Sequence, residues 1–166
     1  VWVVAFVILF QPELRRLLIY VGQTRFFSKI FKVGTSNTIL SIVESSLVLA
    51  KKKWGGLIVI QRETGLRSYK DQGTELKALV TSPLIISIFN PSSPLHDGAI
   101  IIQNDLIDSA ACILPLTESK MIDPQMGTRH RAALGITEET DAIVILISEE
   151  KSKISVAQDG RFVHVG

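Results

Sequence analysis

Short β-branched runs alternate along this chain with stretches of helical periodicity, and this alternation limits the folds open to it. The apolar runs at residues 57–61 and 141–148 predict strands buried in a sheet. Apolar residues recur at helical spacing over residues 39–50, and residues 128–140 also predict a helix. Because helices and strands are interleaved, with hairpins among the strands, we expect an α/β fold. It should be a single globular domain with a central mixed β-sheet flanked by helices.

Start and stop signals bound the predicted helices. Cations at residues 51–53 and Gly55 end the first one. Ser36 or Asn37 could cap the helix at 39–50, and Thr128 is the expected N-cap of the helix at 128–140. A third helix is predicted to start near Ser82, with Pro83 at its first helical position.

Two tight hairpins and one long loop are also expected. Asn104 and Asp105 separate two β-rich runs, and Asp159 with Gly160 does the same near the end of the sequence. The polar stretch 62–73 is typical of a loop. The strand at 141–148 lacks alternation, so we expect it to be fully buried and to end at two glutamates.

Composition excludes several classes of protein. The 166 residues are 46% apolar, enough for one domain with a substantial core, and the net charge of +2 is too small for a chain-wide nucleic-acid footprint. We therefore expect no nucleic-acid partner. The lone Cys112 permits neither a disulfide framework nor a thiolate metal cluster, and we expect it to be buried. A reducing, cytoplasmic setting fits this usage.

Residues 1–10 are apolar and uncharged, and no initiator Met precedes them. We interpret 1–32 as the end of a transmembrane helix with a juxtamembrane linker, and 33–166 as the folded domain of a truncated fragment. Arg15 and Arg16 follow the apolar run, as cations do on a cytoplasmic membrane face. The alternative is a buried N-terminal helix or strand of the domain itself.

A basic turn opens the predicted helix at 128–140. Arg129, His130 and Arg131 lie where the helix N-terminus already carries partial positive charge, so an anion is expected. Forked guanidinium donors, the Thr128 hydroxyl and backbone N–H groups together suit a phosphate chain. The alternative is a solvated surface turn or ion pairs with acids such as Glu138.

Acidic residues could form the other half of a site. Asp97 precedes Gly98 at a predicted sheet end, where it could bind Mg²⁺ or Mn²⁺, help deprotonate a hydroxyl, or simply form an Asx turn. Glu149 and Glu150 end a strand, so alternation predicts that only one of them reaches a given site. His96 beside Asp97 weakly suggests a metal phosphohydrolase. No P-loop or GxGxxG fingerprint is present.

The segments "PLHDGAIII", "GTRHRAALGI" and "ISEE", in this order and spacing, resemble the diadenylate cyclase domain of the membrane-linked CdaA type. The resemblance covers nearly the whole chain. It implies that two ATP molecules are joined into cyclic di-AMP with release of two pyrophosphates, and that a divalent cation, Mn²⁺ or Mg²⁺, is required.

The same resemblance implies roles for individual residues. Asp97 would activate the ribose 3′-hydroxyl and bind the metal together with Glu150, while Gly98 and Ala99 would let the nucleotide lie against the backbone. The triphosphate would be bound by Thr128, Arg129, His130, Arg131 and Ser148. Leu114 would contact the adenine, and Ile113 stands where many CdaA-type enzymes carry a Tyr that can stack on the base.

Two nucleotides must face each other for this reaction, and one triphosphate site holds only one of them. We therefore expect a head-to-tail homodimer. The resemblance also implies a membrane location with the domain facing the cytoplasm, a YbbR-domain membrane regulator and phosphoglucosamine mutase as a partner. Two alternatives stay open: a membrane-tethered nucleotide sensor without catalysis, and a metal-dependent phosphohydrolase.

Overall fold

A computed structural model describes residues 26–163. The apolar run at 1–10 and most of the expected transmembrane and linker segment lie outside the described residues. Across residues 26–163, no helix has both the length and the apolar character needed to cross a bilayer. The chain divides into two units, Val1–Asn37 and Thr38–Gly166, and the second carries the features described below.

A seven-stranded mixed sheet forms the centre of the second unit, with strand order β2-β4-β3-β1-β5-β6-β7. The strands are β1 (Gly56–Ile60), β2 (Thr74–Leu79), β3 (Ala99–Gln103), β4 (Leu106–Cys112), β5 (Ile143–Ile147), β6 (Ile154–Gln158) and β7 (Arg161–Val163). Only β1 and β3 pair in parallel, and the other neighbours in this sheet are antiparallel. The expected mixed α/β architecture is confirmed.

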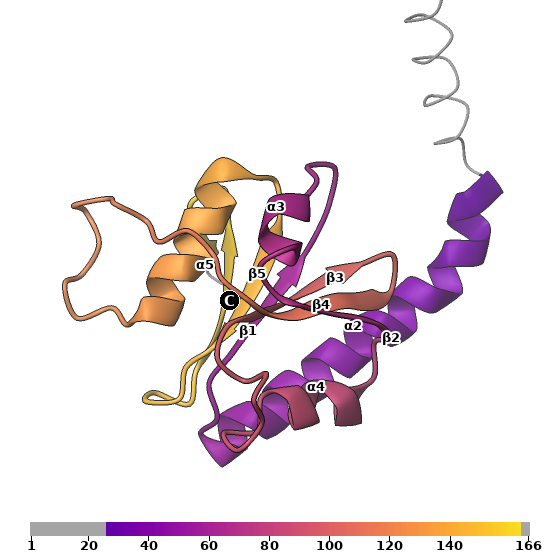
Figure 1. The fold of residues 1–166 in the computed structure, drawn as a ribbon, viewed down its shortest axis with the longest axis horizontal. Coiled ribbons are helices and arrows are strands. Elements are labelled where there is room, and N and C mark those ends of the chain that lie inside the picture. Colours follow the sequence, from indigo (N-terminus) through magenta and orange to yellow (C-terminus); the bar gives the residue numbers. More distant parts are fainter. Residues whose placement is uncertain (1–25, 164–166) are drawn as a thin grey trace, which may run out of the picture. The chain divides into compact units, whose positions relative to one another are not determined.

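Within the second unit, helices cover both faces of the sheet, and α2 takes part through its residues from Thr38 onward (Figure 1). They are α2 (Phe26–Lys52), α3 (Arg67–Lys70), α4 (Ser82–Ile88) and α5 (Thr128–Glu139). Leu57 and Val59 of β1 pack in one core with Ala133 and Ile136 of α5. On the opposite face, Ile58 packs in a second core with residues from α2 and α4. Since successive side chains of a strand point to opposite faces, both faces of β1 are buried.

Several predicted elements are confirmed. Asn104 and Asp105 have φ angles of 50° and 62°, and Asp159 and Gly160 have 51° and 72°, as tight hairpin turns require. Helix α4 is found where it was expected, but its first residue is Ser82, so Pro83 is the second helical residue rather than the first, and Thr81 is the N-cap. Cys112 is buried.

Other expectations about element boundaries were wrong. Helix α2 extends over Phe26–Lys52, so Ser36 and Asn37 lie within it rather than at its start. Gly127, not Thr128, is the N-cap of α5, and no side-chain capping bond is made. The Gly127 carbonyl accepts the N–H of Arg131 at 3.2 Å, so Thr128 is already the first helical residue.

Strand β5 and the segment before β2 also differ from expectation. Ile143 and Ile145 of β5 are only half-buried, so the expectation of a fully buried strand was wrong for this face. The stretch at 62–73 contains the one-turn helix α3, and edge strand β2 follows it. Strand β2 is mostly exposed and therefore lacks the apolar signature of a strand.

Candidate active site

A pocket of about 750 Å³ opens where four strand ends meet the start of α5. Antiparallel pairing places Gly56 beside Ile147, and parallel pairing brings the start of β3 next to the start of β1. The pocket therefore lies at the amino ends of the parallel strands, opposite to the edge that parallel α/β sheets use. Its volume suits a small-molecule ligand.

Most of the predicted site residues line this one pocket. They are Asp97, Gly98, Ile113, Leu114, Thr128, Arg129, His130, Ser148 and Glu150. Ala99 and Arg131 are not among its lining residues. Ala99 is fully buried inside β3, and Arg131 is exposed on α5.

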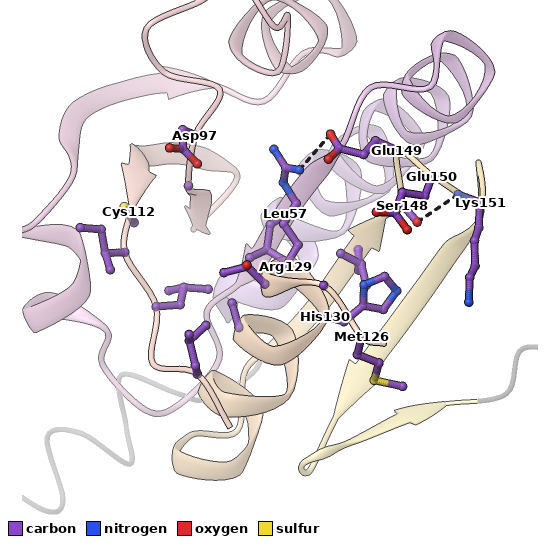
Figure 2. A pocket seen from close by; sticks show the side chains of 18 of the residues that line it. Leu57, Asp97, Cys112, Met126, Arg129, His130, Ser148, Glu149, Glu150 and Lys151 are labelled. Atoms are coloured by element: carbon purple, nitrogen blue, oxygen red, sulfur yellow. Dashed lines mark hydrogen bonds and ion pairs between the residues drawn. The ribbon is translucent and has the colours of Figure 1, made fainter. Parts of the chain in front are cut away.

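Gly98 fits the backbone at the start of β3 for a steric reason. Its φ angle is 131°, and an added Cβ would lie 2.7 Å from the carbonyl carbon of Ala111 and 2.9 Å from the oxygen of Cys112. The neighbouring strand β4 thus occupies the space of a side chain. Asp97 stands immediately before it with an exposed side chain at the pocket wall (Figure 2). His96 instead contacts the Ser93 carbonyl oxygen through Nδ1 at 2.7 Å.

The basic turn contributes one cation and one neutral ring to the pocket. Nη1 of Arg129 lies 3.1 Å from Oε2 of Glu149. Burial lowers the pKa of His130 below its ordinary value of 6.5, and the nearby Lys151 lowers it further, against an opposing effect of Glu150. The imidazole is therefore neutral at physiological pH and can donate one N–H. The alternative of an ion pair with an acid is realised by Glu149, whereas the Glu138 carboxylate accepts the Thr117 hydroxyl.

Ser148, Glu149 and Glu150 follow β5 in a turn rather than in the strand. The backbone N–H of Ser148 donates to the Lys153 carbonyl at 2.9 Å, which closes this turn. Strand alternation therefore ends at Ile147, and both glutamates line the pocket (Figure 2). The expectation that only one could reach the site was wrong. The polar run after Ile147 was the signal that a turn, and not a strand, begins there.

The two predicted metal ligands stand on different walls of the pocket. In Figure 2 Asp97 lies on one side and Glu150 on the other, with the Arg129 side chain between them in that view. Over the described part of the chain, no three Asp, Glu, His or Cys side chains gather closely enough to form a metal site of their own. Mg²⁺ is commonly held by one or two carboxylates together with substrate phosphates. The carboxylates thus fit a cation that arrives with a phosphorylated ligand.

An apolar wall completes the pocket. Leu57, Ile113, Leu116 and Met126 line it together with the buried Leu114. Ile113 is 66% exposed, so its side chain is available to cover a ligand. Sequence reasoning missed Leu57 and Met126, which resemble ordinary core and loop residues in the sequence.

The fold and the pocket define a mixed α/β domain with one pocket that combines a basic helix start, carboxylates and an apolar wall. The sequence model of the family described as DisA bacterial checkpoint controller nucleotide-binding matches residues 43–162. The chain belongs to this family.

Relatives of known name cover most of the chain. It is 47% identical over 159 residues to the cyclic di-AMP synthase CdaA of Bacillus subtilis, and 46% identical over 160 residues to a diadenylate cyclase of Listeria monocytogenes. Each alignment covers 94% of this chain and 58% of the relative, so the chain spans less than two thirds of their length.

Solved structures agree with the fold. A double mutant of DacA from Staphylococcus aureus matches with a TM-score of 0.76 and 43% identity, over 78% of this chain and 86% of that one. A structure described as a hypothetical membrane spanning protein from Bacillus cereus matches with a TM-score of 0.74 and 38% identity, over 94% of this chain and 78% of that one.

Proposed function

We propose that the protein is a diadenylate cyclase, which condenses two ATP molecules into cyclic di-AMP and releases two pyrophosphates. The observation that carries the proposal is the single pocket that holds Asp97, the Thr128 to His130 turn and Glu150 together. The names of the relatives, at 46% and 47% identity, support the same activity.

In this proposal, different groups of residues in the pocket bind the triphosphate, activate the attacking hydroxyl and cover the adenine. Arg129, Thr128 and the neutral His130 bind the triphosphate, and Ser148 donates from the turn after β5. Asp97 accepts the proton of the ribose 3′-hydroxyl as its oxygen attacks an α-phosphorus, and pyrophosphate leaves. The apolar wall with Ile113 and Leu114 covers the adenine. Arg131 lies outside this pocket, so its contribution would come from the exposed face of α5.

We propose Mg²⁺ or Mn²⁺ as the cofactor, with Asp97 and Glu150 as its protein ligands. When bound, such a cation would neutralise phosphate charge and lower the barrier to attack. The carboxylates on the two walls, together with phosphate oxygens, provide the hard oxygen donors that these cations require.

The assembly and the cellular setting are part of the same proposal. One pocket of about 750 Å³ suits one nucleotide, so a head-to-tail homodimer would bring two nucleotides face to face. Membrane attachment of the full-length protein is supported by the similarity to the Bacillus cereus chain, which is described as membrane spanning. A YbbR-domain regulator and phosphoglucosamine mutase are the partners that we propose to test, with the catalytic domain on the cytoplasmic side.

The test is an incubation of the purified protein with ATP and Mn²⁺, with the products separated by chromatography. Cyclic di-AMP is the expected product. ADP or AMP would instead indicate a phosphohydrolase, and unchanged ATP with measurable binding would indicate a sensor. Asp97→Asn should bind ATP but form no product, and turnover at the wild-type rate would remove Asp97 from the mechanism.

A further inference from the structure

The ion pair between Arg129 and Glu149 is unevenly exposed to solvent. Nη1 and Oε2 are 3.1 Å apart, the Arg129 side chain is 26% exposed and the Glu149 side chain 56% exposed. The Arg129 side chain is thus about three-quarters shielded from water, while more than half of the Glu149 side chain is exposed. Figure 2 shows the pair at the pocket, with the guanidinium directed at Glu149.

Gly55, at the junction of α2 and β1, provides the space that the pair occupies. A Cβ at this position would lie 2.5 Å from Nη1 of Arg129, 2.8 Å from its Cζ and 3.0 Å from Oε2 of Glu149. Both members of the pair therefore rest against the backbone of Gly55. The fold holds a defined place for this ion pair at the pocket.

The difference in exposure decides which partner can leave. A cation on a mostly shielded side chain benefits from an anionic partner, because an unpaired charge with reduced access to water is costly. A carboxylate on a side chain that is more than half exposed is solvated again at little cost when it leaves the pair. An incoming phosphate can therefore replace Glu149 on Arg129 without leaving either charge unsolvated.

We propose that Glu149 is the partner of Arg129 before a phosphate binds and is exchanged for a phosphate group of the ligand. Glu149 thereby weakens the binding of triphosphate and of pyrophosphate, and the weaker binding favours release of pyrophosphate. This inference rests on the proposed function, because it takes the phosphate groups of ATP and pyrophosphate as the ligand of Arg129. Glu149 acts through Arg129 and is a positioning residue in this scheme.

Calorimetric titration with inorganic pyrophosphate in EDTA, at about 0.15 M salt, tests the exchange without metal. Glu149→Gln should bind pyrophosphate about two- to fivefold more tightly than the wild type, because the competing charge is gone. Glu149→Asp keeps the charge but withdraws it by one methylene, and it should show a smaller gain. Glu44→Gln, at an exposed position of α2, is the matched control and should bind as the wild type does.

The decisive comparison repeats Glu149→Gln in an Arg129→Ala background. If Glu149 acts through Arg129, the gain there falls below about 1.5-fold. An equal gain in both backgrounds would mean simple charge repulsion and would overturn the exchange. Weaker or unchanged binding of pyrophosphate by Glu149→Gln would also overturn the exchange, since either result shows that Glu149 does not compete with pyrophosphate for Arg129.

Failure of this inference and failure of the proposed function are distinguishable. Cyclic di-AMP formation by the wild type, together with no gain in Glu149→Gln, rejects the exchange alone. A gain in pyrophosphate affinity without any cyclic product rejects the cyclase assignment alone. No binding of pyrophosphate by either protein rejects the exchange, and the ATP incubation then decides the function separately.

Discussion

Two glycines of this pocket are required for different physical reasons. Gly98 has a positive φ angle and faces the backbone of β4, so both conformation and space exclude a side chain. Gly55 has no such backbone constraint, and the atoms against it belong to the side chains of Arg129 and Glu149. A substitution at Gly55 therefore moves flexible side chains, whereas one at Gly98 must move a strand.

Gly55→Ala should alter phosphate binding without unfolding the domain. The new methyl would displace the Arg129 guanidinium, and a displaced charge-assisted contact should lower ATP affinity by roughly three- to tenfold. Calorimetric titration with ATP measures this. Gly65→Ala is the control, because nothing lies within 4 Å of a Cβ there. Unchanged ATP affinity in Gly55→Ala would show that Arg129 reaches the phosphates from another position.

The side chains of this pocket could be predicted only where a motif carries them. Asp97 and Arg129 belong to short polar clusters at element ends, and the structure brings them into one pocket. Only one of Glu149 and Glu150 was expected to reach the pocket, because strand alternation was extended past Ile147, where the strand ends. Gly55 was interpreted as a helix stop, since its role depends on an ion pair from two distant segments.

Helix α5 is joined by close backbone contacts to residues 113–117, which form one wall of the pocket. The N–H of Thr117 donates to the Arg131 carbonyl at 3.0 Å, which ties residues 113–117 to the helix. Gly135 permits this approach, since an added Cβ would lie 2.0 Å from the Pro115 oxygen. The wall that carries Ile113 and Leu114 is thus positioned by α5.

Gly135→Ala should both destabilise the protein and weaken ATP binding. Alanine is the better helix former by about 1 kcal/mol, but the backbone of Pro115 and Thr117 would have to move. We expect a net loss of about 1–3 kcal/mol in the free energy of unfolding, as for other overpacked positions. Urea denaturation measures the stability and titration with ATP the affinity. A gain in stability would show that residues 113–117 shift freely.

Asp141 ties the loop after β1 to the segment between α5 and β5. Its carboxylate accepts the N–H groups of Glu63 and Thr64 at 3.0 and 2.9 Å, and these bonds hold its pKa below the ordinary value of 3.8. Because the pKa is depressed on folding, the charged form stabilises the protein above about pH 4, and this contribution is lost as the pH falls through the folded-state pKa.

Asp141→Asn should therefore be less stable than the wild type at about pH 7, and the difference should shrink as the pH falls below about 4 and through the folded-state pKa. Urea denaturation midpoints at several pH values give this profile. Asp159→Asn, at the tip of the β6–β7 hairpin, is the matched control. A stability difference that persists unchanged into acid would mean that the carboxylate charge does not stabilise the loop.

Elements with strong local signals were predicted, and elements defined by distant contacts were not. The hairpins at Asn104 and Asp159 follow from turn chemistry that operates within a few residues. Strand β2 forms because β4 offers an edge to it, and its own residues are mostly exposed. The N-cap of α5 is Gly127 rather than the predicted Thr128, because the path of the preceding loop determines the residue at which the helix begins.

The assembly follows from the stoichiometry of the proposed reaction rather than from any single element. Cyclic di-AMP contains two phosphodiester bonds, each made by a 3′-oxygen of one nucleotide and the α-phosphorus of the other. One pocket with one triphosphate turn suits one nucleotide. Two chains are therefore needed, and a substitution in one chain should affect the product made with its partner.

Mixing wild-type protein with Asp97→Asn tests this dependence directly. With equal amounts and free exchange, about half of the wild-type chains pair with a variant chain, and cyclic di-AMP production per wild-type chain should fall to about half. A larger excess of the variant should suppress it further. Asp105→Asn, in the hairpin between β3 and β4, should leave production unchanged, since asparagine tolerates the φ of 62° there. Production that does not respond to added Asp97→Asn would mean that each chain acts alone, and the head-to-tail dimer would have to be abandoned.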